Sequence, residues 1–274
     1  MSLYANTDPE CLEHRKLALK KMLDEGTSEQ ELQGFLERNT EFIPRQFVQH
    51  HGIASDLVLT KLSFGRDLVS DLAFVSASSK DFWIVLIELE KPTSKFFKQV
   101  KGVGQISLHS DFRRGLEQVS KWRSWLSEPS NLDHLYRHEL GPIVQSHIWR
   151  KVVVKYVLVT GRREMYKDTT QLRSLVKAEE RDDFAIMTWD SILEHPKEGD
   201  PLYVGKRRSG FIDILTEDLI SDRLFNGIEP GAVRLNRALR ANAEGRALDG
   251  RIMPRRLNSI SVPREVLNKM GDWS

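Results

Sequence analysis

One stretch near the middle of the chain, DFWIVLIELEKP at residues 81–92, constrains the fold more than any other. Its apolar run at residues 83–87 combines aromatic and β-branched side chains, a composition typical of a strand inside a protein. The same strand continues into two carboxylates, Glu88 and Glu90. The chain therefore has to build a core around this strand and accommodate two acids at its end.

Two more strand-like stretches come before it. Residues 53–63, 67–75 and 82–90 all have strand character, and Gly65 and the polar segment SASSKD provide turn material between them. Short turns between successive strands favour antiparallel neighbours. The pattern therefore predicts an antiparallel meander.

The rest of the pattern alternates between helix and strand. Helical spacing or capping residues mark residues 9–25, 27–39, 105–127, 161–180 and 190–195, and β-branched runs mark residues 151–160 and 184–189. The resulting core order is helix, three strands, helix, strand, helix, strand. It predicts an α/β fold with a mixed central sheet flanked by helices.

Beyond about residue 203 the periodic pattern weakens, and Lys and Arg outnumber Asp and Glu. We therefore expect three parts: an N-terminal helical segment at residues 1–27, the α/β domain at residues 28–203, and a basic C-terminal appendage at residues 204–274. The 40% content of hydrophobic residues is enough for a sizeable core.

Composition restricts the classes of function. The single cysteine, Cys11, excludes an intramolecular disulfide and a cysteine-based zinc cluster, and it favours a reducing cytoplasmic location. Residues 1–23 carry acids and bases without an apolar run, and no stretch is long enough to span a bilayer, so we expect no membrane association. The net charge of +2 means that any site for a polyanion has to be a local patch.

The acids at the end of the third strand suggest a metal site. Residues two apart on a strand point to the same face, so Glu88 and Glu90 converge. If the second and third strands form a hairpin, Asp71 lies across from the end of the third strand and adds a third carboxylate. Oxygen ligands at this density suit Mg²⁺ or Mn²⁺ rather than zinc. The alternative is a solvated strand end with Lys91 as counter-charge.

These features together resemble a known family. The order of elements and the segments ELQGFLERNTEF, VSDLAFV, WIVLIELEKP and LEQVSKWRSWL are similar to the PD-(D/E)XK nuclease superfamily, and more narrowly to the Shedu family of antiphage nucleases. The resemblance covers about residues 28–195 and leaves the C-terminal appendage outside.

The resemblance implies roles for individual residues. Asp71 and Glu88 match the metal-binding acids of the superfamily, and Glu90 stands where the superfamily usually has lysine. Glu90 is then expected to act as a general base or as a further metal ligand. Gln118 matches an amide that positions a water or a phosphate oxygen beside the metal. In the leading helix, Glu37 is the favoured additional metal ligand.

The resemblance also implies a substrate and an assembly. It predicts a Mg²⁺- or Mn²⁺-dependent endonuclease that hydrolyses DNA in defence against phage and forms a homo-oligomer. Five basic residues near the acids in sequence are candidates to contact the DNA backbone: Lys91, Lys95, Lys98, Arg114 and Lys121.

Two alternatives to a nuclease stay open at this stage. One is a nucleic-acid-binding protein with a degenerate, inactive site, which the glutamate at position 90 favours. The other is an assembly protein whose basic C-terminal segment makes subunit contacts. A nucleotide-dependent enzyme is disfavoured, because the chain contains neither a Walker-type phosphate loop nor a complete dinucleotide fingerprint.

Overall fold

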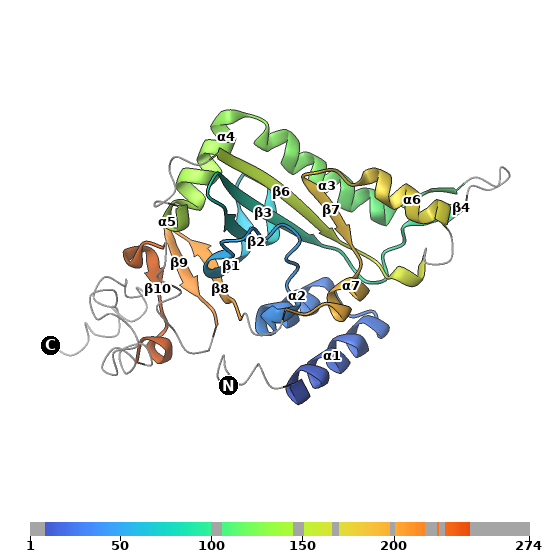
Figure 1. Ribbon diagram of the computed structural model, residues 1–274, viewed down its shortest axis with the longest axis horizontal. Helices are drawn as coiled ribbons and strands as arrows, with labels where there is room; N and C mark the ends of the chain where they lie inside the picture. Colours follow the sequence, from blue (N-terminus) through green and yellow to red (C-terminus); the bar gives the residue numbers. More distant parts are fainter. Residues whose placement is uncertain are drawn as a thin grey trace.

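A computed structural model describes residues 9–99, 106–144, 151–165, 170–197, 201–216, 224 and 228–241. Its centre is an eight-stranded mixed sheet with the order β10-β9-β8-β1-β2-β3-β6-β7 (Figure 1). The strands are β1 (Ile53–Ser63), β2 (Val69–Ala77), β3 (Asp81–Leu89), β6 (Lys151–Val159), β7 (Phe184–Met187), β8 (Tyr203–Arg208), β9 (Phe211–Ile214) and β10 (Val233–Arg234). A separate two-stranded sheet pairs β4 (Phe97–Gln99) with β5 (Ile106–Leu108).

The pairing directions confirm the predicted meander. Strand β2 is antiparallel to both β1 and β3, while β6 runs parallel to β3 and β7 runs parallel to β6. The crossover between β3 and β6 contains a long helix, which is the usual way to connect parallel neighbours. The mixed α/β fold predicted from the sequence is therefore present.

Helices cover both faces of this sheet (Figure 1). One face carries α1 (Pro9–Asp24), α2 (Glu29–Arg38) and α7 (Trp189–Glu194), and the other carries α3 (Ser110–Leu126), α4 (Pro129–His134), α5 (Gly141–Val144) and α6 (Thr170–Glu179). A π-helical turn occupies Leu135–Glu139, and short 3₁₀ turns lie at Thr40–Phe42, Arg163–Met165 and Pro230–Ala232. No helix in the described part of the chain is long and apolar enough to cross a membrane.

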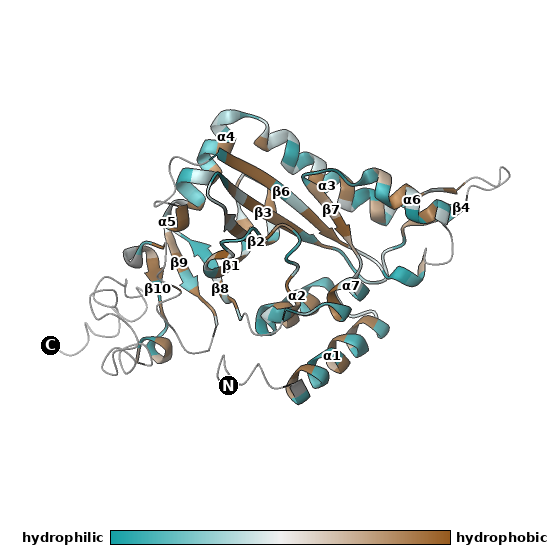
Figure 2. Ribbon diagram, in the orientation of Figure 1, coloured by the Kyte–Doolittle hydropathy of each residue, from teal (hydrophilic) through white to brown (hydrophobic). Residues whose placement is uncertain are grey.

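Two separate hydrophobic cores result, one on each face. Alternate residues of the strands point to opposite sides, so Leu72 and Ile87 join the core under α1, α2 and α7, whereas Ala73 and Leu86 join the core under α3. Figure 2 shows the apolar character of β3 and β6, which lie between the two cores. Strand β3 is thus buried from both sides along its length.

The C-terminal strands extend the same sheet. Strand β8 pairs in parallel with β1, β9 pairs with β8, and β10 pairs with β9. The domain boundary predicted after residue 203 therefore falls inside β8. The described residues of the predicted appendage up to Arg234 continue the central sheet, while residues 242–274 lie outside the described part of the chain.

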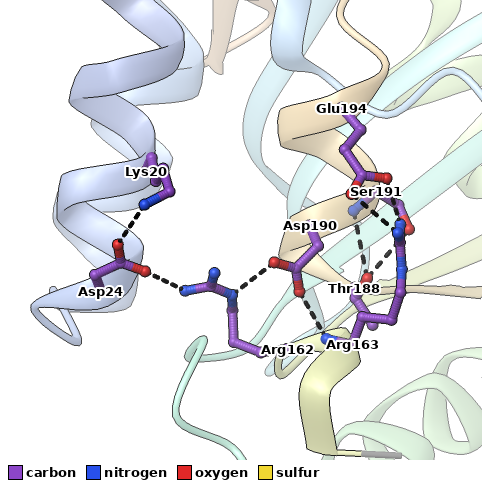
Figure 3. A network of polar contacts seen from close by, with 8 residues as sticks. All are labelled: Lys20, Asp24, Arg162, Arg163, Thr188, Asp190, Ser191 and Glu194. Carbon is purple, nitrogen blue, oxygen red and sulfur yellow. Dashed lines mark hydrogen bonds and ion pairs between the residues drawn. The ribbon is translucent and has the colours of Figure 1, made fainter. Parts of the chain in front are cut away.

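A polar network holds α1 against this domain. The Arg162 guanidinium, just after β6, donates to Asp24 of α1 at 3.0 Å and to Asp190 of α7 at 2.9 Å (Figure 3). Asp190 also accepts a bond from the main-chain N–H of Arg163 at 2.6 Å. Arg162 thus joins two helices to the loop after β6, and the N–H of Gly161 in this loop donates to the carbonyl of Lys91, just after β3, at 3.2 Å.

Candidate metal centre

The candidate site begins where β2 and β3 diverge. The last paired residues of these strands are Leu72 and Ile87, and beyond them β2 pairs only with β1. The Asp71 carboxylate enters the gap, and its Oδ2 accepts a hydrogen bond from the main-chain N–H of Leu89 at 2.7 Å. In this bond a carboxylate oxygen takes the place of a main-chain carbonyl as the acceptor, and it orients the Asp71 side chain toward the end of β3.

Extending the strand register gives a row of charged residues across three strands. One step beyond the last bonded pair, Asp71 of β2 lies opposite Glu88 of β3. On the other side Asp71 neighbours Lys61 of β1, whose Nζ forms an ion pair with Asp71 Oδ1. Lys61 has a left-handed backbone with φ of 47°, unusual for a residue other than glycine. The acids predicted on β2 and β3 are therefore neighbours, and a lysine from β1 accompanies them.

Glu90 follows directly after β3, and its main chain is held on both sides. Its N–H donates to Val159 O of β6 at 2.8 Å, and its carbonyl accepts a bond from Trp189 Nε1 of α7 at 2.8 Å. Its side chain is buried and points toward α3, where Gly115 approaches closely: a Cβ on Gly115 would lie 3.5 Å from Glu90 Cγ. Glu90 thus occupies a fixed position just beyond the C-terminal end of β3.

A bidentate ion pair occupies the Glu90 carboxylate. Arg114 of α3 donates from Nε to Oε1 at 3.1 Å and from Nη2 to Oε2 at 2.5 Å. The Arg114 side chain is 62% exposed and that of Glu90 only 5%. The arginine therefore reaches from the surface to a buried acid.

The acids influence one another electrostatically. Burial raises the pKa of the Glu88 carboxyl to about 9, and the negative charges of Asp71 and Glu90 contribute to the rise. Lys61 acts in the opposite direction and does not cancel these effects. At neutral pH without a bound cation, the geometry therefore favours a protonated Glu88.

A fourth carboxylate, Glu29, lies near the same group. Burial, followed by the charges of Asp71 and Glu90, raises the pKa of Glu29. Glu29 is in the first turn of α2, four residues before Gln33, whose amide donates to the main-chain oxygen of Asp71 at 3.3 Å. The sequence reasoning missed Glu29, although its spacing to the apolar stripe of α2 predicts a position on the sheet-facing side.

Glu37, the predicted helix ligand, is placed differently. It accepts hydrogen bonds from Gln33 Nε2 at 2.9 Å and from Thr60 Oγ1. Thr60 pairs with Leu72, which belongs to the core under α2, whereas Glu90 faces α3 on the other side of the sheet. Gln33 and Thr60 engage the Glu37 carboxylate, and among the described residues no hydrogen bond or ion pair joins it to Asp71, Glu88 or Glu90.

The α3 residues predicted for the site differ in their positions. Gln118 is half-buried and lies one turn beyond Arg114 on the same side of the helix. The side chain from α3 that contacts Glu90 is Arg114.

Four of the predicted DNA-contacting residues are lysines, and all four are exposed: Lys91, Lys95, Lys98 and Lys121.

The donor set suits a hard divalent cation, but two of the donors are already paired. All of the candidate ligand atoms are carboxylate oxygens, which Mg²⁺ and Mn²⁺ prefer. Lys61 binds Asp71 and Arg114 binds Glu90. Within the described ranges, no three His, Cys, Asp or Glu side chains stand together as a ready metal-ligand cluster. Side chains would have to leave these cationic partners before a metal could be held.

Comparison with known proteins supplies the family. No curated protein matches the sequence. A family model described as Shedu protein SduA, C-terminal, matches residues 26–193, more than half of the chain. This range begins just after α1 and ends within α7, so it contains every acid of the candidate site. The chain belongs to the Shedu SduA C-terminal family, a family of antiphage defence proteins.

Proposed function

We propose that this protein is a metal-dependent endonuclease that hydrolyses DNA phosphodiester bonds in defence against phage. The observation that carries the proposal is the grouping of Asp71, Glu88 and Glu90 at one sheet edge, where burial and mutual repulsion raise the pKa of Glu88 to about 9. Lys61 and Arg114 compensate Asp71 and Glu90, so the ionised form of Glu88 is the charge that these two cations leave uncompensated. A divalent cation is the compensation that oxygen ligands favour.

The PD-(D/E)XK core is part of the same proposal. Its support is the order of elements, in which α2 precedes the β1-β2-β3 meander and α3 leads to β6 in parallel with β3. The acids lie at the point where β2 and β3 diverge, at the end of a strand that lies between the two hydrophobic cores. This arrangement presents carboxylates from rigid strands, which is favourable for precise positioning.

In this proposal the residues have distinct roles. Asp71 and Glu88 would hold a Mg²⁺ or Mn²⁺ ion, with Glu90 and Glu29 as the nearest further carboxylates. When bound, the ion supplies Lewis-acid polarisation of the phosphate and a lowered pKa of the attacking water. Glu90 would serve as a further ligand of the ion or as the group that accepts the proton of that water, and Gln118 would orient the water from α3. The Asp71 carboxylate is kept in register by its bond from Leu89 N–H.

Exposed basic residues would bind the DNA backbone. Lys91 and Lys95 follow the acidic end of β3, Lys98 lies on β4, and Arg114 and Lys121 lie on α3. Contacts of this kind release counterions, so affinity for DNA should fall steeply as salt rises. Replacing the four lysines by alanine should weaken binding to all DNA sequences alike and reduce the salt dependence.

Cleavage of a supercoiled plasmid tests the proposed activity. The full chain should convert the plasmid to nicked or linear forms with Mg²⁺ or Mn²⁺ and should leave it intact with EDTA. Light scattering on the same preparation tests the proposed homo-oligomer. A protein that binds the plasmid and leaves it intact under every metal condition would contradict the nuclease.

A second candidate function is a nucleic-acid-binding or assembly protein with an inactive site. The pairing of Asp71 with Lys61 and of Glu90 with Arg114 favours it, because an internally neutralised carboxylate needs no metal. Thermal unfolding distinguishes the two. A nuclease of the proposed kind should be stabilised by Mn²⁺, and the stabilisation should disappear in Asp71→Asn. An inactive protein should show the same melting temperature with Mn²⁺ and with EDTA.

A further inference from the structure

The two partners of the Arg114–Glu90 ion pair differ strongly in their exposure to solvent. Arg114 lies mostly in solvent, yet both of its fork nitrogens bind a carboxylate that is almost fully buried. Both oxygens of Glu90 are used by this one partner. The pair therefore engages both oxygens of the acid while leaving the guanidinium accessible from outside.

The surroundings confine any change at this pair to the side chains. The Glu90 main chain is bonded to Val159 of β6 and to Trp189 of α7, so its backbone position is fixed. On the other side, α3 packs against β6 so closely that a Cβ on Gly115 would lie 2.9 Å from Leu158 Cδ1. Rotation of the exposed Arg114 side chain is the change that this packing leaves easiest.

A phosphodiester is a natural competitor for this guanidinium. The arginine fork binds phosphate and carboxylate with the same bidentate geometry, and the exposed position of Arg114 lets a phosphate approach without entering the core. Departure of Arg114 would leave a buried carboxylate without its cation, which is strongly unfavourable. That deficit raises the affinity of Glu90 for another cation.

We propose that Arg114 is a latch that couples nucleic-acid binding to the carboxylate site. In the free protein the guanidinium fork is held by Glu90. A bound phosphodiester takes the fork, and Glu90 becomes available as a ligand for a divalent cation. The latch rests on the proposed function, and it adds that a bound nucleic acid raises the affinity of the site for its metal.

A double-mutant cycle tests the competition without any metal. Affinity for a short fluorescent DNA duplex would be measured by anisotropy in EDTA for the wild type, Glu90→Gln, Arg114→Ala and the double variant. Glu90→Gln should bind about fivefold more tightly than the wild type, because it releases Arg114. In the Arg114→Ala background the same change should have almost no effect. An equal gain in both backgrounds would mean a general charge effect and would overturn the latch.

Mn²⁺ binding tests the second half of the proposal. Calorimetry should show that the duplex, made with phosphorothioate linkages to block cleavage, raises the Mn²⁺ affinity of the wild type about fivefold or more. Arg114→Ala should bind Mn²⁺ more tightly than the wild type without DNA and should gain nothing from the duplex. Arg114→Lys, which keeps the charge and loses the fork, should fall between them. Arg113→Ala, at the exposed neighbour on α3, should keep the wild-type response.

The two proposals fail in different ways. If the wild type binds Mn²⁺ with the same affinity in the presence and absence of the duplex, the latch is overturned and the nuclease is not. If Arg114→Ala weakens Mn²⁺ binding, the arginine supports the site and the latch is also overturned. If the wild type binds no Mn²⁺ even with the duplex, both the latch and the metal-dependent nuclease are overturned.

Discussion

The indole Nε1 of Trp189 donates a hydrogen bond to the main-chain carbonyl of Glu90 at 2.8 Å, and the Trp189 side chain is fully buried. This single bond joins α7 to the end of the strand that carries the candidate site. Trp189→Phe should leave the Glu90 carbonyl without this donor and lower the free energy of unfolding in urea by about 2–4 kcal/mol, the sum of a cavity and a lost bond.

Trp122 offers a matched control for this prediction. It is equally buried, and its Nε1 has no hydrogen-bond partner among the described residues. Trp122→Phe should therefore lose packing alone and cost about 1 kcal/mol less than Trp189→Phe. Equal losses in the two variants would show that the bond to Glu90 contributes nothing measurable.

The raised pKa of Glu88 predicts a pH-dependent stability in metal-free buffer. At a pH below the ordinary carboxyl pKa of 4.5, Glu88 is protonated in both the folded and the unfolded chain. As the pH rises toward 9, the unfolded chain loses this proton first, so the folded state becomes less stable relative to the unfolded state. Glu88→Gln replaces the ionisable carboxyl with a neutral amide and should raise the free energy of unfolding at alkaline pH by on the order of 1–3 kcal/mol.

Urea denaturation in EDTA at several pH values measures this effect. The difference between Glu88→Gln and the wild type should be small at acidic pH and should grow through neutral pH. Glu117→Gln, a change at an exposed acid of α3, should show no such growth. A pH-independent difference for Glu88→Gln would contradict the assignment of the raised pKa.

Gly115 is predicted to be required for the close approach of α3 to the sheet. Its added Cβ would meet both Cδ atoms of Leu158 at 2.9 and 3.0 Å. Gly115→Ala should therefore destabilise the protein by about 1–3 kcal/mol, despite the higher helix propensity of alanine. At Gly34 of α2 the nearest atom is the flexible end of Arg38 at 3.4 Å, so Gly34→Ala should stabilise by about 0.5–1 kcal/mol.

Thermal and urea unfolding of these two variants provide the comparison. The substitution is the same and both positions are in helices. Opposite signs of the two changes in stability would therefore come from the packing of α3 against β6. Stabilisation by Gly115→Ala would show that α3 can move away from Leu158 without loss, and Glu90 would then lack the rigid neighbour described above.

Arg162 is predicted to hold α1 on the domain. Its side chain is largely buried and joins Asp24 to Asp190 (Figure 3). Arg162→Ala should leave Asp190 without this partner, cost about 1–3 kcal/mol, and increase hydrogen exchange in α1. Lys20→Ala removes an exposed contact to the same Asp24 and should cost about 0.5 kcal/mol or less. Unchanged exchange in α1 for Arg162→Ala would contradict this role.

The sequence predicts the central elements well because their patterns are local. The predicted strand 53–63 coincides with β1, and the hairpin expected between VSDLAFV and WIVLIELE is sufficient to place Asp71 beside the end of β3. The helix predicted from residue 105 begins later, at Ser110, because Ile106–Leu108 pair with β4. The helix predicted over 161–180 is also shorter, since Gly161 has a φ of 55° and α6 begins at Thr170.

Long-range partners account for what the sequence does not predict. The segment at Tyr203–Arg208 has little strand character, and it forms β8 because β1 offers an unpaired edge. The contact of Lys61 with Asp71 depends on a left-handed residue inside β1, which no local signal indicates. In α2, Glu29, Gln33 and Glu37 share one face of the helix. The sequence alone does not show that Glu29 lies near the site while Glu37 binds Thr60.

The most direct test of the central claim compares two glutamate variants in one cleavage assay. With Mg²⁺ or Mn²⁺ and a supercoiled plasmid, Glu88→Gln should lose at least about a hundredfold in cleavage rate while it binds the plasmid as well as the wild type. Glu117→Gln should cleave at the wild-type rate. Wild-type cleavage by Glu88→Gln, or metal-dependent cleavage that survives in Asp71→Asn, would contradict a nuclease site built on these acids.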